Sequence, residues 1–162
     1  MSTSQCDIGA RVVSRWCALA FGATILSGHS SAQAQQPSVI QTITRWGLLG
    51  TWAVDCDKPS KDGSRVTYEI RNGRPAYVRD LGGGRRDIAD IGRAFVNPDG
   101  SLVTRLDFSS VIGERYVTLI RGPDAKIRAK VNQGANGSYT VFDGKTVHDG
   151  VPTRWQARCN AP

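Results

Sequence analysis

The sequence contains few of the residues that commonly build catalytic or metal sites. It has two histidines and four cysteines among 162 residues, and none of them forms a cluster with the spacing of zinc ligands. No Gly-x-Ser-x-Gly nucleophile elbow is present. His148 stands beside Asp149 in a glycine-rich stretch, which is typical of a solvated loop. We therefore expect neither an enzyme nor a resident metal or cofactor.

The sequence also lacks an apolar run long enough to span a bilayer, which takes about 20 residues. Its apolar run over residues 16–26 is shorter and follows the basic residues Arg11 and Arg15. Polar residues and then the small-x-small cleavage site at 32–34 complete the pattern of a signal peptide. We predict a cleaved signal peptide over 1–34 and a periplasmic or secreted protein that is not integral to the membrane. A buried N-terminal helix is the alternative.

Cleavage at this site would leave 128 residues, with a lead containing a short helix over 35–47 and a β domain over 48–162. The net charge of the remaining chain is about +6. A basic surface attracts anionic polymers and lipids. Because an exported protein rarely meets nucleic acid, we expect an anionic envelope component as the partner of this charge. A generally basic surface without a partner is the alternative.

Two cysteines, Cys56 and Cys159, remain outside the predicted signal peptide. An even pair in an oxidising compartment predicts a disulfide. Its loop would span about 100 residues and would stabilise the fold by a few kcal/mol. Two free buried thiols are the alternative.

The residue pattern after the lead predicts short strands separated by turns. Apolar residues at helical spacing predict one or two helical turns over 39–46. Val66, Tyr68 and Ile70 alternate with polar residues, and Asn72-Gly73 then forms a typical hairpin turn. The predicted strands cover 49–56, 64–70, 75–80, 86–96, 102–108, 114–121, 126–131, 139–142 and 153–159. Connections this short favour antiparallel neighbours, and regular short strands favour a closed barrel or a sandwich.

Gly50-Thr51-Trp52 follows the helical lead and opens the first strand. This opening resembles the Gly-x-Trp signature of the lipocalin and calycin barrels. The resemblance implies an all-β, antiparallel up-and-down barrel of eight to nine strands with Trp52 at its closed end. It also implies an arginine packed on Trp52, for which Arg154 and Arg158 are the candidates, and a disulfide that ties the C-terminal segment to the barrel. Gly50, Trp52 and these arginines would then be structural.

The resemblance has limits. The Thr-Asp-Tyr motif of a typical lipocalin is missing, which places the chain outside the core of that family. The opening also resembles the biotin-binding barrels of the avidin type, but the three tryptophans after residue 34 are too few for a biotin pocket. A small periplasmic barrel that inhibits metalloproteases is a further relative to consider, although its two cysteines lie close together in sequence.

Two functions from different classes compete. The leading hypothesis is an exported lipocalin-like protein that binds a small apolar or amphipathic ligand in the envelope, and it requires a hollow barrel. The alternative is a protein-interaction module, such as a protease inhibitor or an envelope assembly factor, with a filled barrel. A calycin-type enzyme that acts on a lipid-like molecule is a third possibility, and it would need polar groups that converge around His148 or an arginine.

The interior and the ligand contacts are less clear from the sequence. Small residues at inward positions would leave room for a ligand, whereas large ones would fill the centre. The small residues are Ala89, Ala129 and Ala157, and the large ones are Phe95, Phe108 and Phe142. Arg85 and Arg86 follow a run of three glycines and are the candidate contacts for an anion at the mouth of the barrel.

Overall fold

A computed structural model describes residues 36–60 and 65–159, all within the compact unit Gln35–Pro162. The predicted signal peptide lies outside the described residues. The described chain begins with α1 (Val39–Trp46), at the predicted helical residues. Ser38 caps this helix by accepting a hydrogen bond from the backbone of Gln41, whose side chain accepts one from the backbone of Ser38. None of the helices in these residues has the length and apolar content needed to cross a membrane.

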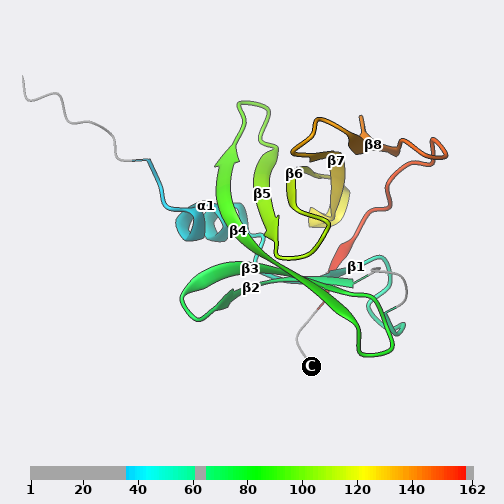
Figure 1. Cartoon of the computed structure of the whole chain (residues 1–162), viewed down its shortest axis with the longest axis horizontal. Coiled ribbons are helices and arrows are strands. Elements are labelled where there is room, and N and C mark those ends of the chain that lie inside the picture. The colour runs from blue at the N-terminus through cyan, green and yellow to red at the C-terminus, as the bar shows by residue number, and fades with distance from the viewer. Residues whose placement is uncertain (1–35, 61–64, 160–162) are drawn as a thin grey trace, which may run out of the picture. The chain divides into compact units, whose positions relative to one another are not determined.

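The strands form one antiparallel sheet in which each strand from β1 to β8 pairs with the next, and β10 pairs with β1 (Figure 1). The strands are β1 (Gly50–Ala53), β2 (Arg65–Arg71), β3 (Arg74–Asp80), β4 (Arg86–Val96), β5 (Leu102–Phe108), β6 (Glu114–Arg121), β7 (Ile127–Gly134), β8 (Tyr139–Phe142), β9 (Lys145–Thr146) and β10 (Ala157–Cys159). A 3₁₀ turn, η1 (Pro123–Ala125), connects β6 to β7. The prediction of an all-β antiparallel fold with a short N-terminal helix is confirmed.

The sheet has more strands than predicted, and it is not closed. The described chain contains ten strands instead of eight or nine, because the two-residue strand β9 has too short a pattern to recognise. No strand ladder joins β9 to β10 in the described residues. Two isolated bridges connect the C-terminal segment to the far side of the sheet, Gln156 to Ile127 and Pro152 to Lys145. The order of the strands therefore agrees with that of an up-and-down barrel, but the sheet itself is not closed.

Strand β4 carries the chain from one layer of the structure to the other. In Figure 1 it crosses from the layer of β1, β2 and β3 into the layer of β5, β6 and β7. The register of its pairing with β5 shifts between Ile91 and Arg93, which marks a β-bulge at Gly92. A Cβ atom at Gly92 would contact the ends of the Asp107 and Arg105 side chains, which would have to move to admit it.

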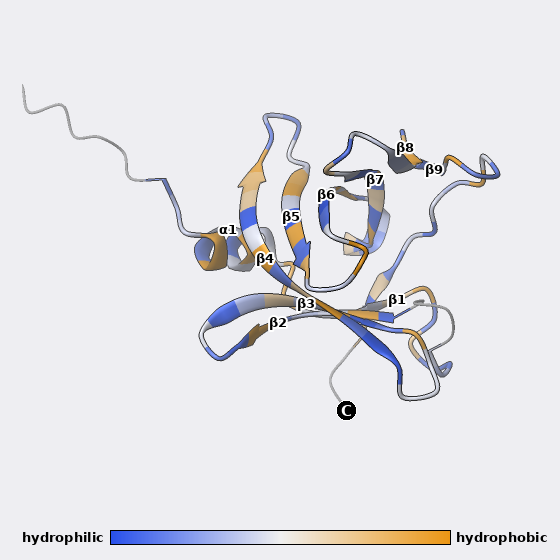
Figure 2. Cartoon of the chain, in the orientation of Figure 1, coloured by the Kyte–Doolittle hydropathy of each residue, from blue (hydrophilic) through white to orange (hydrophobic). Residues whose placement is uncertain are grey.

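The core lies between α1 and the inward face of the sheet. Ile43, Leu48, Leu102 and Ile127 are completely buried, and Trp52 is 2% exposed. Its indole N–H donates to the carbonyl of Leu48 at 2.7 Å, so the buried polar atom is satisfied. In Figure 2, β4 and β5 alternate between apolar and polar residues along their length, as expected for strands with one buried face.

The two cysteines lie at disulfide distance, as predicted. The sulfur atoms of Cys56 and Cys159 are 2.07 Å apart, and their Cα atoms are 5.4 Å apart. The pair joins the segment after β1 to the end of β10, across 103 residues of sequence. It therefore fastens the C-terminal strand to the first strand.

Candidate functional site

The inward face of the sheet lines an open cavity of about 660 Å³. Ligand pockets commonly measure about 300–1,000 Å³. The cavity wall comes from β2, β3, β5, β6 and β7, and its mouth from β8, β9 and the segment 151–156. Its wall combines aliphatic side chains such as Val66, Leu106 and Val117 with polar and charged ones. The packed core therefore does not fill the whole inward face of the sheet.

Three aromatic rings form a row on one wall of the cavity. Tyr68 meets Tyr77 edge to face with ring centroids 5.5 Å apart, and Tyr77 meets Phe108 at 5.9 Å. Ala89 lies in register with Tyr77 on one side and Phe108 on the other, and it is 1% exposed. Because Ala89 is small, the rings of its neighbours on β3 and β5 approach each other above it. The small inward residue thus supports an aromatic wall.

The large residues considered for the interior separate into two groups. Phe108 lines the cavity, together with the small residue Ala129. Phe95 and Phe142 are 41% and 58% exposed and do not line it. The half-buried Ala157 lies in β10 and does not line it either. Of these three phenylalanines, only Phe108 therefore contributes to the cavity wall.

The two tyrosine hydroxyls remain protonated donors. Burial raises the pKa of Tyr77 to about 12, and it also raises the pKa of Tyr68. Neither hydroxyl is among the buried side-chain atoms that lack a hydrogen-bond partner in the described residues, so each can donate to solvent or to a molecule in the cavity.

An arginine and an asparagine add unpaired polar atoms to the cavity. Arg115 on β6 and Asn132 on β7 both line it. The Nη1 atom of Arg115 and the Oδ1 atom of Asn132 are buried without a hydrogen-bond partner among the described residues. Arg115 also has no ion pair there, whereas Arg79, another lining residue, is paired with Asp87. Arg115 is therefore a half-buried cation that lines this cavity and has no ion pair among the described residues.

The mouth of the cavity is polar. Arg154 is exposed there, and Asp149 lines the rim. The hydroxyl of Thr146 donates to the Asp149 carboxylate, as does the backbone N–H of Val151 at 3.0 Å. These bonds, that from Thr146 above all, lower the pKa of Asp149. The carboxylate thus holds the rim turn together, while the exposed His148 beside it does not line the cavity.

The residues of the Gly-x-Trp opening lie near the C-terminal strand. Trp52 is in register with Arg158 on β10. Gly50 has a φ of 128°, and a Cβ atom there would lie 2.9 Å from Nε of Arg158. Glycine thus lets this guanidinium lie against the backbone of β1. In the described residues, the arginines that stack on tryptophan are Arg121 on Trp46, at 4.4 Å, and Arg128 on Trp155, at 4.5 Å. Neither of the two candidates, Arg154 and Arg158, stacks on Trp52 there.

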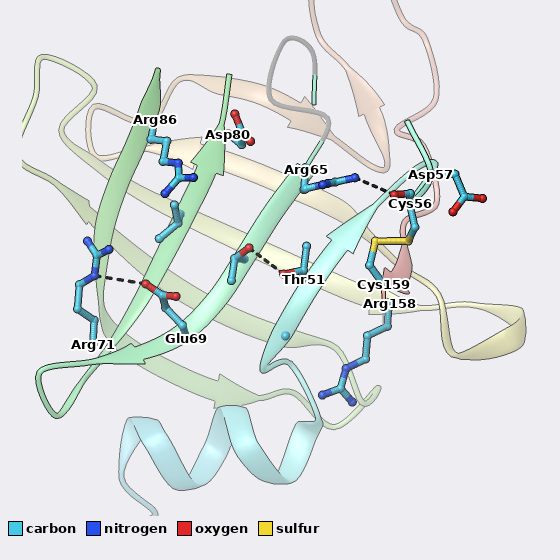
Figure 3. A pocket seen from close by; sticks show the side chains of 13 residues that line it. Thr51, Cys56, Asp57, Arg65, Glu69, Arg71, Asp80, Arg86, Arg158 and Cys159 are labelled. Carbon is cyan, nitrogen blue, oxygen red and sulfur yellow. Dashed lines mark hydrogen bonds and ion pairs between the residues drawn. A yellow bond between two sulfur atoms is a disulfide. The ribbon is translucent and has the colours of Figure 1, made fainter. Parts of the chain in front are cut away.

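Arg85 and Arg86 lie away from the cavity. Arg85 is exposed in a loop closed by a hydrogen bond from the N–H of Leu81 to its carbonyl, and Arg86 lines a groove of about 1,000 Å³ on the outward face of the sheet. Figure 3 shows this groove, with Arg71 directed at Glu69 and Arg65 at the backbone of Cys56. Its lining mixes arginines with carboxylates, as is usual for a solvated sheet face. The two arginines do not reach a ligand in the interior cavity.

The strand pattern of the sequence contains a signal for Arg115. Arg115 has the same phase along its strand as Val117 and Leu119, which face inward. A charged residue at an inward position is unusual and indicates either an ion pair or a ligand contact. Arg79 also occupies an inward position, two residues after Tyr77, and it forms an ion pair with Asp87.

No family model matches the chain, and neither a curated protein nor a solved structure matches it. In the described residues, no group of three or more histidine, cysteine or acidic side chains is placed to hold a metal ion. The cavity is therefore the feature that bears on function.

We expect a spectrophotometric titration to separate the buried tyrosines from the others. In the folded protein, Tyr77 should ionise near pH 12 and Tyr68 should also be delayed, whereas in denaturant all four tyrosines should ionise near pH 10. Because the folded pKa is raised, the stability from these groups is complete below about pH 10 and is lost as the pH rises toward 12. Ionisation of all four near pH 10 in the folded state would contradict the burial of this wall.

Proposed function

We propose that this protein is an exported, lipocalin-like carrier that binds a small amphipathic molecule with an anionic group. The observation that carries the proposal is the cavity of about 660 Å³, whose wall combines aromatic and aliphatic side chains with Asn132 and with Arg115, a half-buried cation that has no ion pair among the described residues. Ligand sites typically combine a largely apolar lining with a few polar groups that orient the ligand.

The proposed ligand has two parts. Its apolar part lies on the aromatic row of Tyr68, Tyr77 and Phe108, which offers ring faces and edges rather than charge. Its carboxylate or phosphate accepts a hydrogen bond from Arg115, and hydrogen bonds to charged groups are about twice as strong as neutral ones. The amphipathic ligand thus matches both the wall and the cation.

The barrel and the location outside the cytoplasm belong to the same proposal. The segment containing Pro152 and Gln156 bridges β9 and β7, and β10 continues from it to pair with β1; these contacts support a barrel that this segment would complete. The pattern of basic residues, apolar run and cleavage site over 1–34 supports export. The paired cysteines fit an oxidising compartment.

The test is native mass spectrometry of the protein purified after expression of the full-length chain. We expect a mass excess that disappears on denaturation and that gives the mass of the ligand. Arg115→Leu should lower the occupancy about tenfold or more, because a hydrogen bond to a charged group contributes about 1.5–3 kcal/mol. Arg86→Leu is the matched control, since Arg86 is on the outward face, and it should leave the occupancy unchanged.

If native mass spectrometry shows no bound ligand, a titration with added ligands provides the second test. Medium-chain fatty acids and aromatic carboxylates are titrated into the protein, and the melting temperature is recorded. A carrier should be stabilised by at least one of these compounds, and Arg115→Leu should abolish the shift. If no mass excess is found and no carboxylate stabilises the wild-type protein, the proposed function is wrong.

A further inference from the structure

A second groove, of about 880 Å³, lies between α1 and the last residues of β4. Strand β3 pairs only with the first part of β4, and this pairing ends at Asp90. Strand β5 pairs with β4 on the other side as far as Val96. Among the described residues, no backbone hydrogen bond from outside these ladders reaches 92–96. This part of β4 therefore has one unpaired edge, and the edge faces the groove.

The groove wall is apolar on both sides. Phe95 and Val96 are 41% and 48% exposed on β4, and Val39 and Trp46 face the groove from α1. An exposed strand edge with apolar side chains is a ready template for pairing with another strand, and proteins usually protect such edges with charges, prolines or bulges. Here the bulge at Gly92 precedes the edge, and α1 packs beside β4 so that the groove lies between the helix and this edge.

A buried hydroxyl gives independent support for an occupant. Thr42 lines the groove from α1 and is 6% exposed. Its Oγ1 atom is buried and has no hydrogen-bond partner among the described residues. A buried polar atom of this kind is costly unless it is satisfied by a binding partner.

The charges at the groove indicate which kind of molecule it can bind. Arg45 and Arg93 line it, and no carboxylate does among the described residues. A second copy of this chain pairing edge to edge would bring like charges together, which is destabilising. An acidic peptide would bring opposite charges together.

We infer that the free edge of β4 binds an extended peptide that has apolar residues at alternate positions and acidic residues at its ends. The peptide adds a strand beside β4, and its backbone pairs with residues 92–96. This mode of recognition draws affinity from main-chain hydrogen bonds and specificity from alternate side chains. The inference is independent of the interior cavity, because none of the residues that line the groove lines the cavity.

The experiment compares three blocked, fluorescent heptapeptides. The first is Asp-Val-Thr-Val-Thr-Val-Asp, the second has lysine in place of both aspartates, and the third is the first with N-methyl groups on alternate backbone amides. Fluorescence anisotropy is measured with the protein purified after expression of the full-length chain. We expect the acidic peptide to bind, the basic one to bind at least tenfold more weakly, and the methylated one not to bind. In NMR spectra, the amide signals of 92–96 should shift with the acidic peptide.

Three variants localise the binding. Phe95→Asp should weaken it at least tenfold, whereas Phe142→Asp should leave it unchanged, because Phe142 is an exposed aromatic residue on β8 that does not line the groove. Thr42→Val should weaken binding severalfold without lowering the melting temperature, because it removes a buried hydroxyl that has no partner in the described chain.

Other results would overturn the inference. If the methylated peptide binds as well as the parent peptide, the groove is an apolar patch rather than a site for strand addition. If light scattering shows a dimer that Phe95→Asp dissociates, the occupant is a second copy of the chain. If the acidic peptide does not bind at millimolar concentration, the edge is closed to peptides.

Discussion

Replacing both Cys56 and Cys159 by serine should lower the free energy of unfolding by about 2–4 kcal/mol. The pair lies at disulfide distance and closes a loop of 103 residues, which is most of the described chain. A cross-link over a loop of this length removes much of the conformational entropy of the unfolded state. It also fastens β10 to β1, where the two strands share only three register pairs. The loss should therefore appear as unfolding at lower urea concentration and as a lower melting temperature.

Reduction provides the control for this prediction. A reducing agent should destabilise the wild-type protein by about as much as the double substitution does, and it should have no effect on the double variant. The free-thiol content of the unreduced, unfolded protein should be zero for this pair. An unreduced protein with two reactive thiols, or one whose stability is indifferent to reduction, would show that the cysteines are not linked.

The backbone of the fold was largely predictable because its signals are local. Helix α1 and strands β4 and β6 begin and end at the predicted residues. Asn72-Gly73 makes the predicted hairpin turn, with φ values of 50° and 75°. Alternation of apolar and polar residues depends on neighbouring positions and on burial of one face, so a single sequence is sufficient to recognise it.

The ends of the sheet were less predictable because they depend on distant partners. The last strand was predicted over 153–159, but only Ala157–Cys159 forms β10. Residues 152 and 156 before it make isolated bridges to β9 and β7 instead of a continuous ladder. Whether a sheet closes depends on how its two edges meet, which no local pattern states.

The candidate site was predicted only in outline. A hollow interior was one of two alternatives, and the residues singled out for anion contact, Arg85 and Arg86, lie outside the cavity. Arg85 and Arg86 adjoin a run of three glycines, and such a run indicates a turn rather than a binding site. Arg115 becomes recognisable only when its side chain is placed on the inward face and its Nη1 atom is seen to lack a partner.

Replacing Trp52 by alanine should lower the free energy of unfolding by about 3–5 kcal/mol. Trp52 is 2% exposed, and it belongs to the core cluster together with Ile43 and Leu48. Its removal leaves a cavity and deprives the Leu48 carbonyl of its 2.7 Å hydrogen bond. Because domains of this size are stable by only about 5–15 kcal/mol, the variant should be close to unfolding.

Two further variants separate the causes of this loss. Trp52→Phe keeps most of the apolar surface but not the N–H donor, so it should destabilise the fold less than alanine does. Trp155→Ala removes a tryptophan that is only half-buried and stacked on Arg128, and it should cost less than Trp52→Ala. Urea unfolding followed by circular dichroism measures all three. If Trp52→Ala unfolds at the same urea concentration as Trp155→Ala, Trp52 is not the anchor between α1 and β1, and the structural role expected for it in the Gly-x-Trp opening fails.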